Sequence, residues 1–210
     1  MKLLSEILTS TEVLSFTASD QVQITGLTYD SRRVSKGDCF FAVRGTQSDG
    51  HNYIGKAIEA GAAVIVCEQL PEQLNPAVSY VVVKDTNAAM ADIAAAYYDK
   101  AFANHPNILI PVRDTKSTHV FHQYTLRLVD VNRDALREAL AEKGIPAMIY
   151  YPIPLHMQKA YQDARYQTGD FPVAEKLAAC VLSLPMHTEL DDEQLEYITT
   201  HVIQAINAQH

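Results

Sequence analysis

The sequence predicts an α/β fold made of two small domains that share one continuous helix. Strand-like and helix-like segments alternate through the first half of the 210 residues, which is typical of α/β domains. Residues 88–103 then form an Ala-rich run without Pro or Gly, which predicts one long helix. Beyond this run, helices and strands follow in an order typical of an α+β domain. We therefore expect one domain over residues 1–98 and a second over residues 99–210.

In the first half, each element is predicted from its hydrophobic spacing and its turn residues. Apolar residues at helical spacing predict a short helix at residues 3–8 and another at residues 52–60, which Gly61 ends. Runs of β-branched and aromatic residues predict strands, two of them apolar on both faces as in a parallel sheet. The expected strands are residues 22–29, 39–43, 63–67 and 80–84.

In the second half, capping residues help to delimit the elements. Asn132 and Gly144 are suited to begin and end a helix at residues 133–143. Alternating or apolar runs predict further strands, and residues 183–186 should be extended. The remaining elements are expected strands at 108–112, 119–131 and 147–151, and expected helices at 173–182 and 191–208.

Composition argues against several classes of protein. The chain has 25 acidic and 17 basic residues and a formal charge of -8, and no basic run alternates with aromatic residues, so we expect no nucleic-acid partner. No apolar stretch is long enough for a signal peptide or a membrane span. The three cysteines show no CxxC spacing and suit buried thiols in a reducing compartment. We therefore expect a soluble, cytoplasmic protein.

Four ordered motifs in the first half carry a family resemblance. They are LTYDSR at 27–32, GDCFFAVRG at 37–45, DGH at 49–51 and AIEAGA at 57–62. Residues 1 to about 98 resemble the amino-terminal, UDP-binding domain of Mur ligases, most closely the MurE type. The resemblance implies that a UDP moiety binds at Tyr29, Ser31, Thr46, Gln47 and Ser48. Hydroxyl groups, loop N–H groups and an amide suit a diphosphate and a uracil edge, although such residues are also common in ordinary turns.

The ligase resemblance stops before the catalytic machinery. A Mur ligase continues from this domain into a phosphate loop that binds ATP, and no G-x-x-x-x-G-K-[ST] motif occurs in this sequence. The domain that selects the incoming amino acid is missing as well. We therefore expect no ligase activity.

From about residue 97 onward, a second family resemblance begins. Its motifs are YYDKAF at 97–102, HVFHQY at 119–124, RDAL at 133–136, YPIPLHMQ at 151–158, DFPVAE at 170–175 and LSLPMH at 182–187. Residues 97–208 resemble the carboxy-terminal small domain of DegT-type nucleotide-sugar aminotransferases, which have fold type I and use pyridoxal phosphate.

The aminotransferase resemblance implies that the cofactor site is incomplete. In that family the Schiff-base lysine and the acid that pairs with the pyridine nitrogen lie on the large domain, which is missing. A solvated surface role is expected for the lysines of this half, Lys100, Lys116, Lys143, Lys159 and Lys176. We therefore expect no bound cofactor.

Three histidines of the second half are candidate site residues. His119 and His122 are three apart on an expected strand and should point to opposite faces, so they do not suit a shared metal. His156 and Gln158 belong to a segment that borders the substrate mouth in intact aminotransferases. Here they are either an orphaned part of that mouth or, for His156, a structural residue. We expect neither a metal site nor catalytic residues.

These observations predict a non-catalytic chimera, engineered or recombined, with a stiff helical junction at residues 94–100. Its expected ligands are UDP and UDP-N-acetylmuramoyl compounds, bound weakly by the first domain. The alternative is a subunit or remnant of a nucleotide-sugar enzyme that needs a partner to supply the missing catalytic domain. A homodimer is also expected, because the second domain should expose an apolar face that a large domain once covered.

Overall fold

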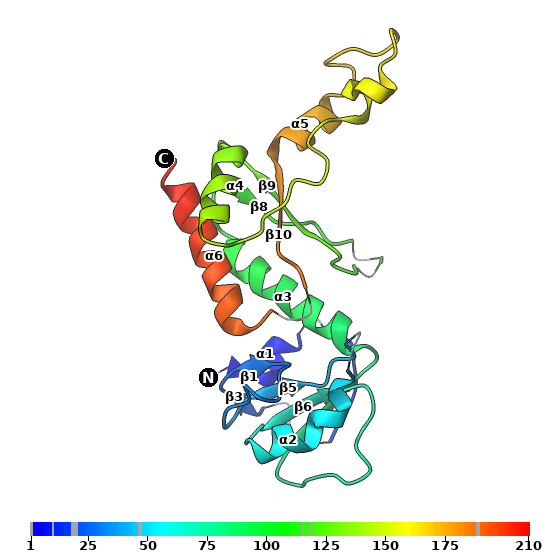
Figure 1. The fold of residues 1–210 in the computed structure, drawn as a ribbon, viewed down its shortest axis with the longest axis vertical. Helices are drawn as coiled ribbons and strands as arrows, with labels where there is room; N and C mark the ends of the chain where they lie inside the picture. The colour runs from blue at the N-terminus through cyan, green and yellow to red at the C-terminus, as the bar shows by residue number, and fades with distance from the viewer. Residues whose placement is uncertain are drawn as a thin grey trace. The chain divides into compact units, whose positions relative to one another are not determined.

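The structure is a computed structural model that describes residues 2–9, 11–17, 21–45, 48–114, 116–117, 119–187 and 190–210. Its residues divide into two compact units (Figure 1). The first unit comprises Met1–Tyr97 and His187–Glu196, and the second comprises Tyr98–Met186 and Tyr197–His210. The division into domains of residues 1–98 and 99–210 stays a prediction.

The centre of the first unit is a five-stranded sheet in the order β2-β7-β6-β5-β4. The last four strands of that order are parallel to one another, and β2 pairs antiparallel to β7 at the edge. Strand β2 was not predicted, because its mostly exposed residues lack apolar alternation. The strands are β2 (Val13–Phe16), β7 (Ser79–Val83), β6 (Val64–Cys67), β5 (Cys39–Phe41) and β4 (Leu27–Thr28).

Alternate residues of this sheet enter two separate cores, because side chains along a strand point to opposite faces. Cys39 and Phe41 pack with α1 (Leu4–Ile7) and with the first turns of α3 (Thr86–Phe102). Phe40 packs on the other face with α2 (Ile54–Glu59), which follows the short helix η1 (Gly50–Tyr53). The first unit therefore has helices on both faces of its sheet, as expected for an α/β fold.

The predicted strand at residues 22–29 is two strands that belong to different sheets. β3 (Gln23–Ile24) pairs with β1 (Lys2–Leu3), whereas β4 pairs with β5. The buried Asp38 carboxylate lies at the break, where it accepts hydrogen bonds from the Thr25 hydroxyl at 2.7 Å and the Ser35 N–H at 2.7 Å. The first of these contacts gives the Thr25 side chain a partner outside β3 and β4.

Helix α3 (Thr86–Phe102) runs without interruption from the first unit into the second. The Asp85 carboxylate begins it by accepting hydrogen bonds from the N–H groups of Asn87 at 2.8 Å and Ala88 at 3.1 Å. No break occurs between Ala94 and Lys100, and the predicted continuous helix is confirmed.

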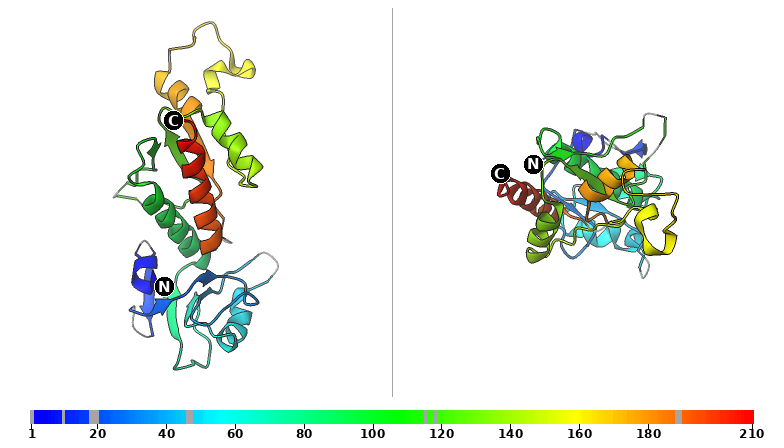
Figure 2. Two further views of the ribbon diagram at one scale, coloured as in Figure 1. Left: turned by 90° about the vertical axis from the view of Figure 1, so that its left-hand side faces the viewer. Right: turned by 90° about the horizontal axis from the view of Figure 1, so that it is seen from above.

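The second unit has a three-stranded antiparallel sheet in the order β10-β9-β8. Tyr98 and Phe102 of α3 are fully buried in this unit, with Tyr124 of β9 tilted against Tyr98 at 4.9 Å between ring centroids. Helices α4 and α6 lie side by side (Figure 2). The elements are β8 (Ile108–Leu109), β9 (Tyr124–Leu128), α4 (Arg133–Glu142), α5 (Pro172–Cys180), β10 (Val181–Leu184) and α6 (Asp192–Asn207).

Three predicted strands of this unit are clearly shorter in the structure, and the helix predicted at residues 173–182 ends earlier. The strand expected at 108–112 is β8, which has two residues. The strand expected at residues 119–131 is reduced to β9, because Phe121 with φ of 41° and Asp130 with φ of 56° have left-handed backbone. The strand at 147–151 is a single bridge between Met148 and Ser183. Helix α5 ends at Cys180, because Val181 begins β10.

Residues 150–171 form an extension of the second unit, which we call the arm. It projects beyond α5, away from the sheet of that unit (Figure 1). Its only helical pieces are the short helices η2 (Leu155–Met157) and η3 (Lys159–Tyr161). Large apolar side chains of the arm are exposed, including those of Tyr151 at 77% and Leu155 at 62%.

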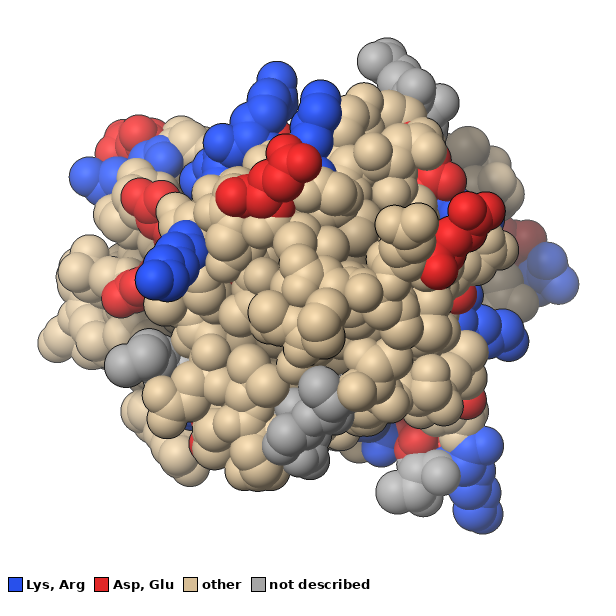
Figure 3. Space-filling model, turned by 90° about the horizontal axis from the view of Figure 1, so that it is seen from below, with Lys and Arg blue, Asp and Glu red and all other residues tan. Residues whose placement is uncertain are grey.

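In the part of the chain that the structure describes, no helix is long and apolar enough to cross a membrane. The face drawn in Figure 3 carries basic and acidic side chains close together near its margin, around a broad area of other residues. This face therefore presents mixed charge.

Candidate functional site

A cavity of about 730 Å³ lies in the first unit, where β4 and β5 end. Tyr29 and Ser31 follow β4, and Ser48 lies in the loop after β5; all three line the cavity. Because β4 and β5 are parallel, their carboxyl ends meet at the same edge of the sheet, where ligands of α/β proteins commonly bind. Thr46 and Gln47, the other two predicted site residues, lie outside the described residues.

A tight turn after β4 presents Ser31 to the cavity. The Asp30 carboxylate accepts a hydrogen bond from the Arg32 N–H at 2.9 Å and forms an ion pair with the Arg32 guanidinium at 2.7 Å. The hydrogen bonds from that guanidinium are the main cause that lowers the pKa of Asp30 below its ordinary value. Ser31 is held between these two partners. Within the described part of the chain its hydroxyl has no hydrogen-bond partner, and it is therefore available to a ligand.

The opposite side of the cavity is formed by the loop of residues 43–50, of which the structure describes residues 43–45 and 48–50. The N–H of Gly45 donates to the Ser48 carbonyl at 3.0 Å, and the N–H of Gly50 donates to the Val43 carbonyl at 2.8 Å. Gly50 lies so close to the chain that a Cβ would be 2.6 Å from the Val43 nitrogen and oxygen. Any other residue at this position would displace the loop.

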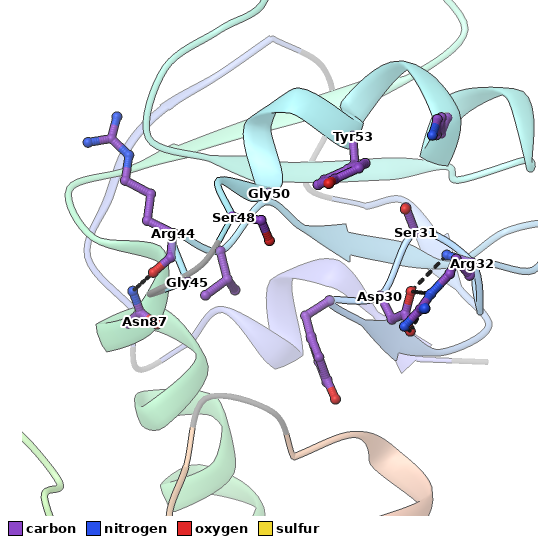
Figure 4. Close-up of a pocket in the computed structure, with 12 residues that line it drawn as sticks. Asp30, Ser31, Arg32, Arg44, Gly45, Ser48, Gly50, Tyr53 and Asn87 are labelled. Carbon is purple, nitrogen blue, oxygen red and sulfur yellow. Dashed lines mark hydrogen bonds and ion pairs between the residues drawn. The ribbon is translucent and has the colours of Figure 1, made fainter.

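The labelled residues surround the cavity on three sides (Figure 4). Asp30, Ser31 and Arg32 lie on one side, and Gly45, Ser48 and Asn87 lie on the other. The ring of Tyr53 occupies a third side, with the Lys56 ammonium 5.5 Å from its centroid.

The lining carries more positive than negative charge. Three cations line it, Arg32, Arg44 and Lys56, against the single carboxylate of Asp30. Arg44 points away from the other side chains in Figure 4 and pairs with Glu68 at 3.1 Å and Asp49 at 3.6 Å. Among the lining residues that the structure describes, Lys56 is the cation without a carboxylate partner. An anion in the cavity can therefore attract this ammonium group.

The groups of this lining suit the binding of a ligand. Two serine hydroxyl groups, an ammonium group and two phenol rings suit a phosphate and an aromatic base. Neither a histidine nor a cysteine is among the described residues that line the cavity. The lining includes residues that were not predicted as site residues, among them Asp30, Arg32, Tyr53, Lys56 and Asn87. For Tyr53 and Lys56, the only signal in the sequence was their spacing of three residues within the helix predicted at residues 52–60.

In the second unit, a cavity of about 450 Å³ lies beside the arm and is lined in part by His156, Asp163 and Tyr166. His156 is nearly buried; its Nε2 atom lies 3.1 Å from the Glu175 carboxylate, and its ring tilts against Phe171 at 4.7 Å. The same carboxylate accepts a hydrogen bond from the Gly169 N–H at 2.8 Å. His156 thus contributes to the packing that holds the arm to α5.

The residues of the second unit do not fit a Schiff-base site for pyridoxal phosphate. None of the five lysines named from the sequence lines the cavity beside the arm, and all of them are exposed. In the described residues, no group of three or more His, Cys, Asp or Glu side chains could hold a metal ion.

Comparison with protein families identifies the two parts of the chain. The model described as the DegT/DnrJ/EryC1/StrS aminotransferase family matches residues 73–203, more than half of the chain. The chain belongs to this aminotransferase family. The model described as the Mur ligase family, catalytic domain, matches residues 23–98. Both resemblances that the sequence predicted are confirmed, and the two matches overlap within residues 73–98.

Curated relatives match different shares of this DegT-family chain. A UDP-N-acetylmuramoyl-L-alanyl-D-glutamate–2,6-diaminopimelate ligase of Clostridium acetobutylicum is 33% identical over 173 residues, which are 80% of this chain and 34% of that ligase. A UDP-N-acetylmuramoyl-L-alanyl-D-glutamate–2,6-diaminopimelate ligase of Bacteroides fragilis is 44% identical over 95 residues, which are 45% of this chain and 20% of the ligase. A pleiotropic regulatory protein of Geobacillus stearothermophilus is 46% identical over 86 residues, or 41% of this chain and 23% of that protein. The chain thus spans between about a fifth and about a third of these curated relatives.

Among solved structures, the chain is similar to DesV of S. venezuelae in complex with a ketimine intermediate. The match has a TM-score of 0.53 and 32% sequence identity, and it covers 57% of this chain and 32% of DesV. The aminotransferase-like part therefore shares both sequence and fold with one portion of a larger enzyme.

Proposed function

We propose that this chain is a non-catalytic chimera that binds UDP-sugar compounds weakly through the cavity of its first unit. The observation that carries the proposal is the meeting of Tyr29, Ser31 and Ser48 around one cavity that also contains the unpaired cation Lys56. The Bacteroides fragilis relative, whose name includes a UDP-N-acetylmuramoyl dipeptide, supports this class of ligand.

The lining suggests how such a ligand would bind. A diphosphate placed between Ser31 and the loop of residues 43–50 would accept hydrogen bonds from the Ser31 and Ser48 hydroxyls and attract Lys56. The Tyr53 ring offers an aromatic surface to the uracil base. Affinity should be weak, because a small open cavity with few charged contacts covers only part of such a ligand.

A fusion within α3 supports the chimera. The ligase-like and aminotransferase-like matches overlap on residues that include the first turns of this helix, and the helix is continuous. The lack of a phosphate-loop motif and the poor fit to pyridoxal phosphate support a role without turnover. The three free cysteines support a reducing, cytoplasmic location.

Binding can be tested by calorimetric titration with UDP-N-acetylmuramoyl-L-alanyl-D-glutamate and with UDP. We expect saturable binding that Ser31→Ala weakens about tenfold, because a hydrogen bond to a charged group is lost. The matched control is Ser35→Ala, since Ser35 is exposed, belongs to the same unit and does not line the cavity. Equal affinities of the two variants, or no saturation up to millimolar ligand, would refute the proposal.

The exposed arm favours a second candidate, a subunit that needs a partner. Tyr151 and Leu155 are 77% and 62% exposed, and apolar side chains of this size commonly mark an interface. The partner of this candidate would supply the missing catalytic domain of a nucleotide-sugar enzyme. Self-association through the same apolar surface, as a homodimer, is a separate expectation that sedimentation over a range of concentrations would detect. An aldimine absorbance band that survives dialysis after pyridoxal phosphate is added would instead favour a functional aminotransferase part.

A further inference from the structure

His51 joins the loop that lines the cavity to the end of the neighbouring strand. Its Nδ1 atom lies 2.7 Å from Oδ1 of Asp49 at the end of the loop, and its Nε2 atom accepts a hydrogen bond from the Glu68 N–H at 3.0 Å. Glu68 directly follows β6. One imidazole ring therefore connects two segments that are 17 positions apart in the sequence.

These partners determine where the proton of the ring lies. Because the Glu68 N–H can only donate, Nε2 must carry a lone pair. Nδ1 then carries the proton, which it donates to the Asp49 carboxylate. The contact pattern therefore requires a neutral imidazole with its hydrogen on Nδ1.

The charged groups around His51 keep this arrangement in place. Asp49 accepts hydrogen bonds from the backbone and the ring of His51, and the backbone bond is the main cause that lowers the pKa of this carboxyl below its ordinary value. On the opposite side, the Glu68 carboxylate pairs with Arg44 and accepts a hydrogen bond from the Thr86 N–H at 3.1 Å. Asp49, Arg44 and Glu68 are the charged residues whose contacts with this cluster the structure describes.

Protonation of His51 breaks only one of its two contacts. An imidazolium keeps and strengthens its pair with Asp49. The new hydrogen on Nε2, however, faces the hydrogen of the Glu68 N–H, and two donors cannot bond. The ring must therefore leave the Glu68 N–H, and the loop loses the contact with the end of β6 that the imidazole provides, while the ion pair of Arg44 with the Glu68 carboxylate remains.

We propose that His51 is a positioning residue that holds the cavity loop in its binding conformation only while its imidazole is neutral, so that ligand affinity falls with acidification. The part of this inference that concerns affinity rests on the proposed UDP-sugar binding. The attachment of the loop by His51 does not depend on that proposed function.

Nitrogen-15 NMR of the ligand-free protein tests the attachment directly. At about pH 8 we expect Nε2 of His51 to show the shift of an unprotonated nitrogen and the Glu68 amide to exchange slowly with solvent. At about pH 5, the Glu68, Gly45 and Ser48 amide signals should have shifted together with the ring nitrogen signals. Protonated Nε2 at high pH, or a Glu68 amide that is unaffected when the ring titrates, would overturn the proposal.

UDP titrations at both pH values then test the effect on the site. Wild-type affinity should fall at least about fivefold more than that of His51→Gln, a variant that keeps an acceptor without a titrating ring and also corrects for protonation of the phosphate. His122→Gln removes an exposed histidine of the second unit and should behave as wild type. Equal pH dependence in His51→Gln and wild type would overturn the role of His51. If the NMR shifts occur but UDP binds at neither pH, the proposed function fails and the attachment stands.

Discussion

The loop of residues 43–50 and the arm of residues 150–171 both carry motifs of larger enzymes, but their supports differ. The loop is closed by two backbone hydrogen bonds, and the adjacent His51 attaches it to the end of β6. The arm contains two short helices, and most of its side chains are exposed. All the partners described for the loop belong to the first unit, so a fusion farther along α3 leaves them in place. In a chimera, a site is expected to keep its geometry when the residues that contact and hold it come from the same parent protein.

Gly50→Ala should have the largest effect, because it disturbs the backbone support of the loop of residues 43–50. The new methyl group would lie 2.6 Å from backbone atoms of Val43, which cannot move aside as a flexible side chain could. We expect a loss of about 2–3 kcal/mol in the free energy of unfolding, as for other overpacked positions. Urea denaturation followed by circular dichroism would measure this loss.

Gly55→Ala is the matched control for that variant. Gly55 lies within α2, and a Cβ there would meet no atom within 4 Å. Because alanine favours helices over glycine, we expect this variant to be as stable as wild type or more stable by up to about 1 kcal/mol. If Gly50→Ala were equally harmless, the loop would not be fixed by its close approach to Val43.

The sequence predicted the sheet of the first unit and the shared helix because those elements are long or strongly apolar. It did not predict the split of residues 22–29, since that break depends on the contacts of Asp38, a residue distant from the strand in sequence. The length of β9 was overestimated for a similar reason. The hydrophobic alternation continues through Phe121, and the left-handed backbone there appears only in three dimensions.

The candidate site was predicted through a family resemblance rather than from residue chemistry. Tyr29, Ser31 and Ser48 were named, and the structure brings them to one cavity. Lys56 and Asn87 were not named, because a lysine on a helix and an asparagine near a helix start are ordinary in sequence. His51 was missed for a clearer reason, since its partner at Glu68 is a backbone group and leaves no signal in the sequence.

In the arm, a change of pH should have a smaller effect, which concerns the protection of one backbone amide from hydrogen exchange. The pKa of Glu175 is held below its usual value, first by the hydrogen bond from the Gly169 N–H and also by His156. A lowered carboxyl pKa stabilises the folded state above the ordinary value of about 4.3, and this contribution is lost as the pH falls through the lowered pKa. Protection of the Gly169 amide from hydrogen exchange should therefore be complete near neutral pH and decrease below about pH 4.

Glu175→Gln should already lack part of this protection at neutral pH, because an amide oxygen is a weaker acceptor than a carboxylate. Glu138→Gln on α4 removes an exposed carboxylate that is not in the arm and should leave the Gly169 amide unchanged. Identical exchange in Glu175→Gln and wild type would show that the carboxylate does not hold the arm.

The central claim is that ligand recognition survives in the first unit and not in the arm. Its most direct test is a titration of the nitrogen-15-labelled protein with UDP-N-acetylmuramoyl-L-alanyl-D-glutamate, followed residue by residue. The account predicts saturable shifts at the amides of Ser31, Gly45 and Ser48, with the arm amides of residues 150–171 unmoved. Shifts confined to the arm, or no saturable shift in the first unit at millimolar ligand, would contradict it.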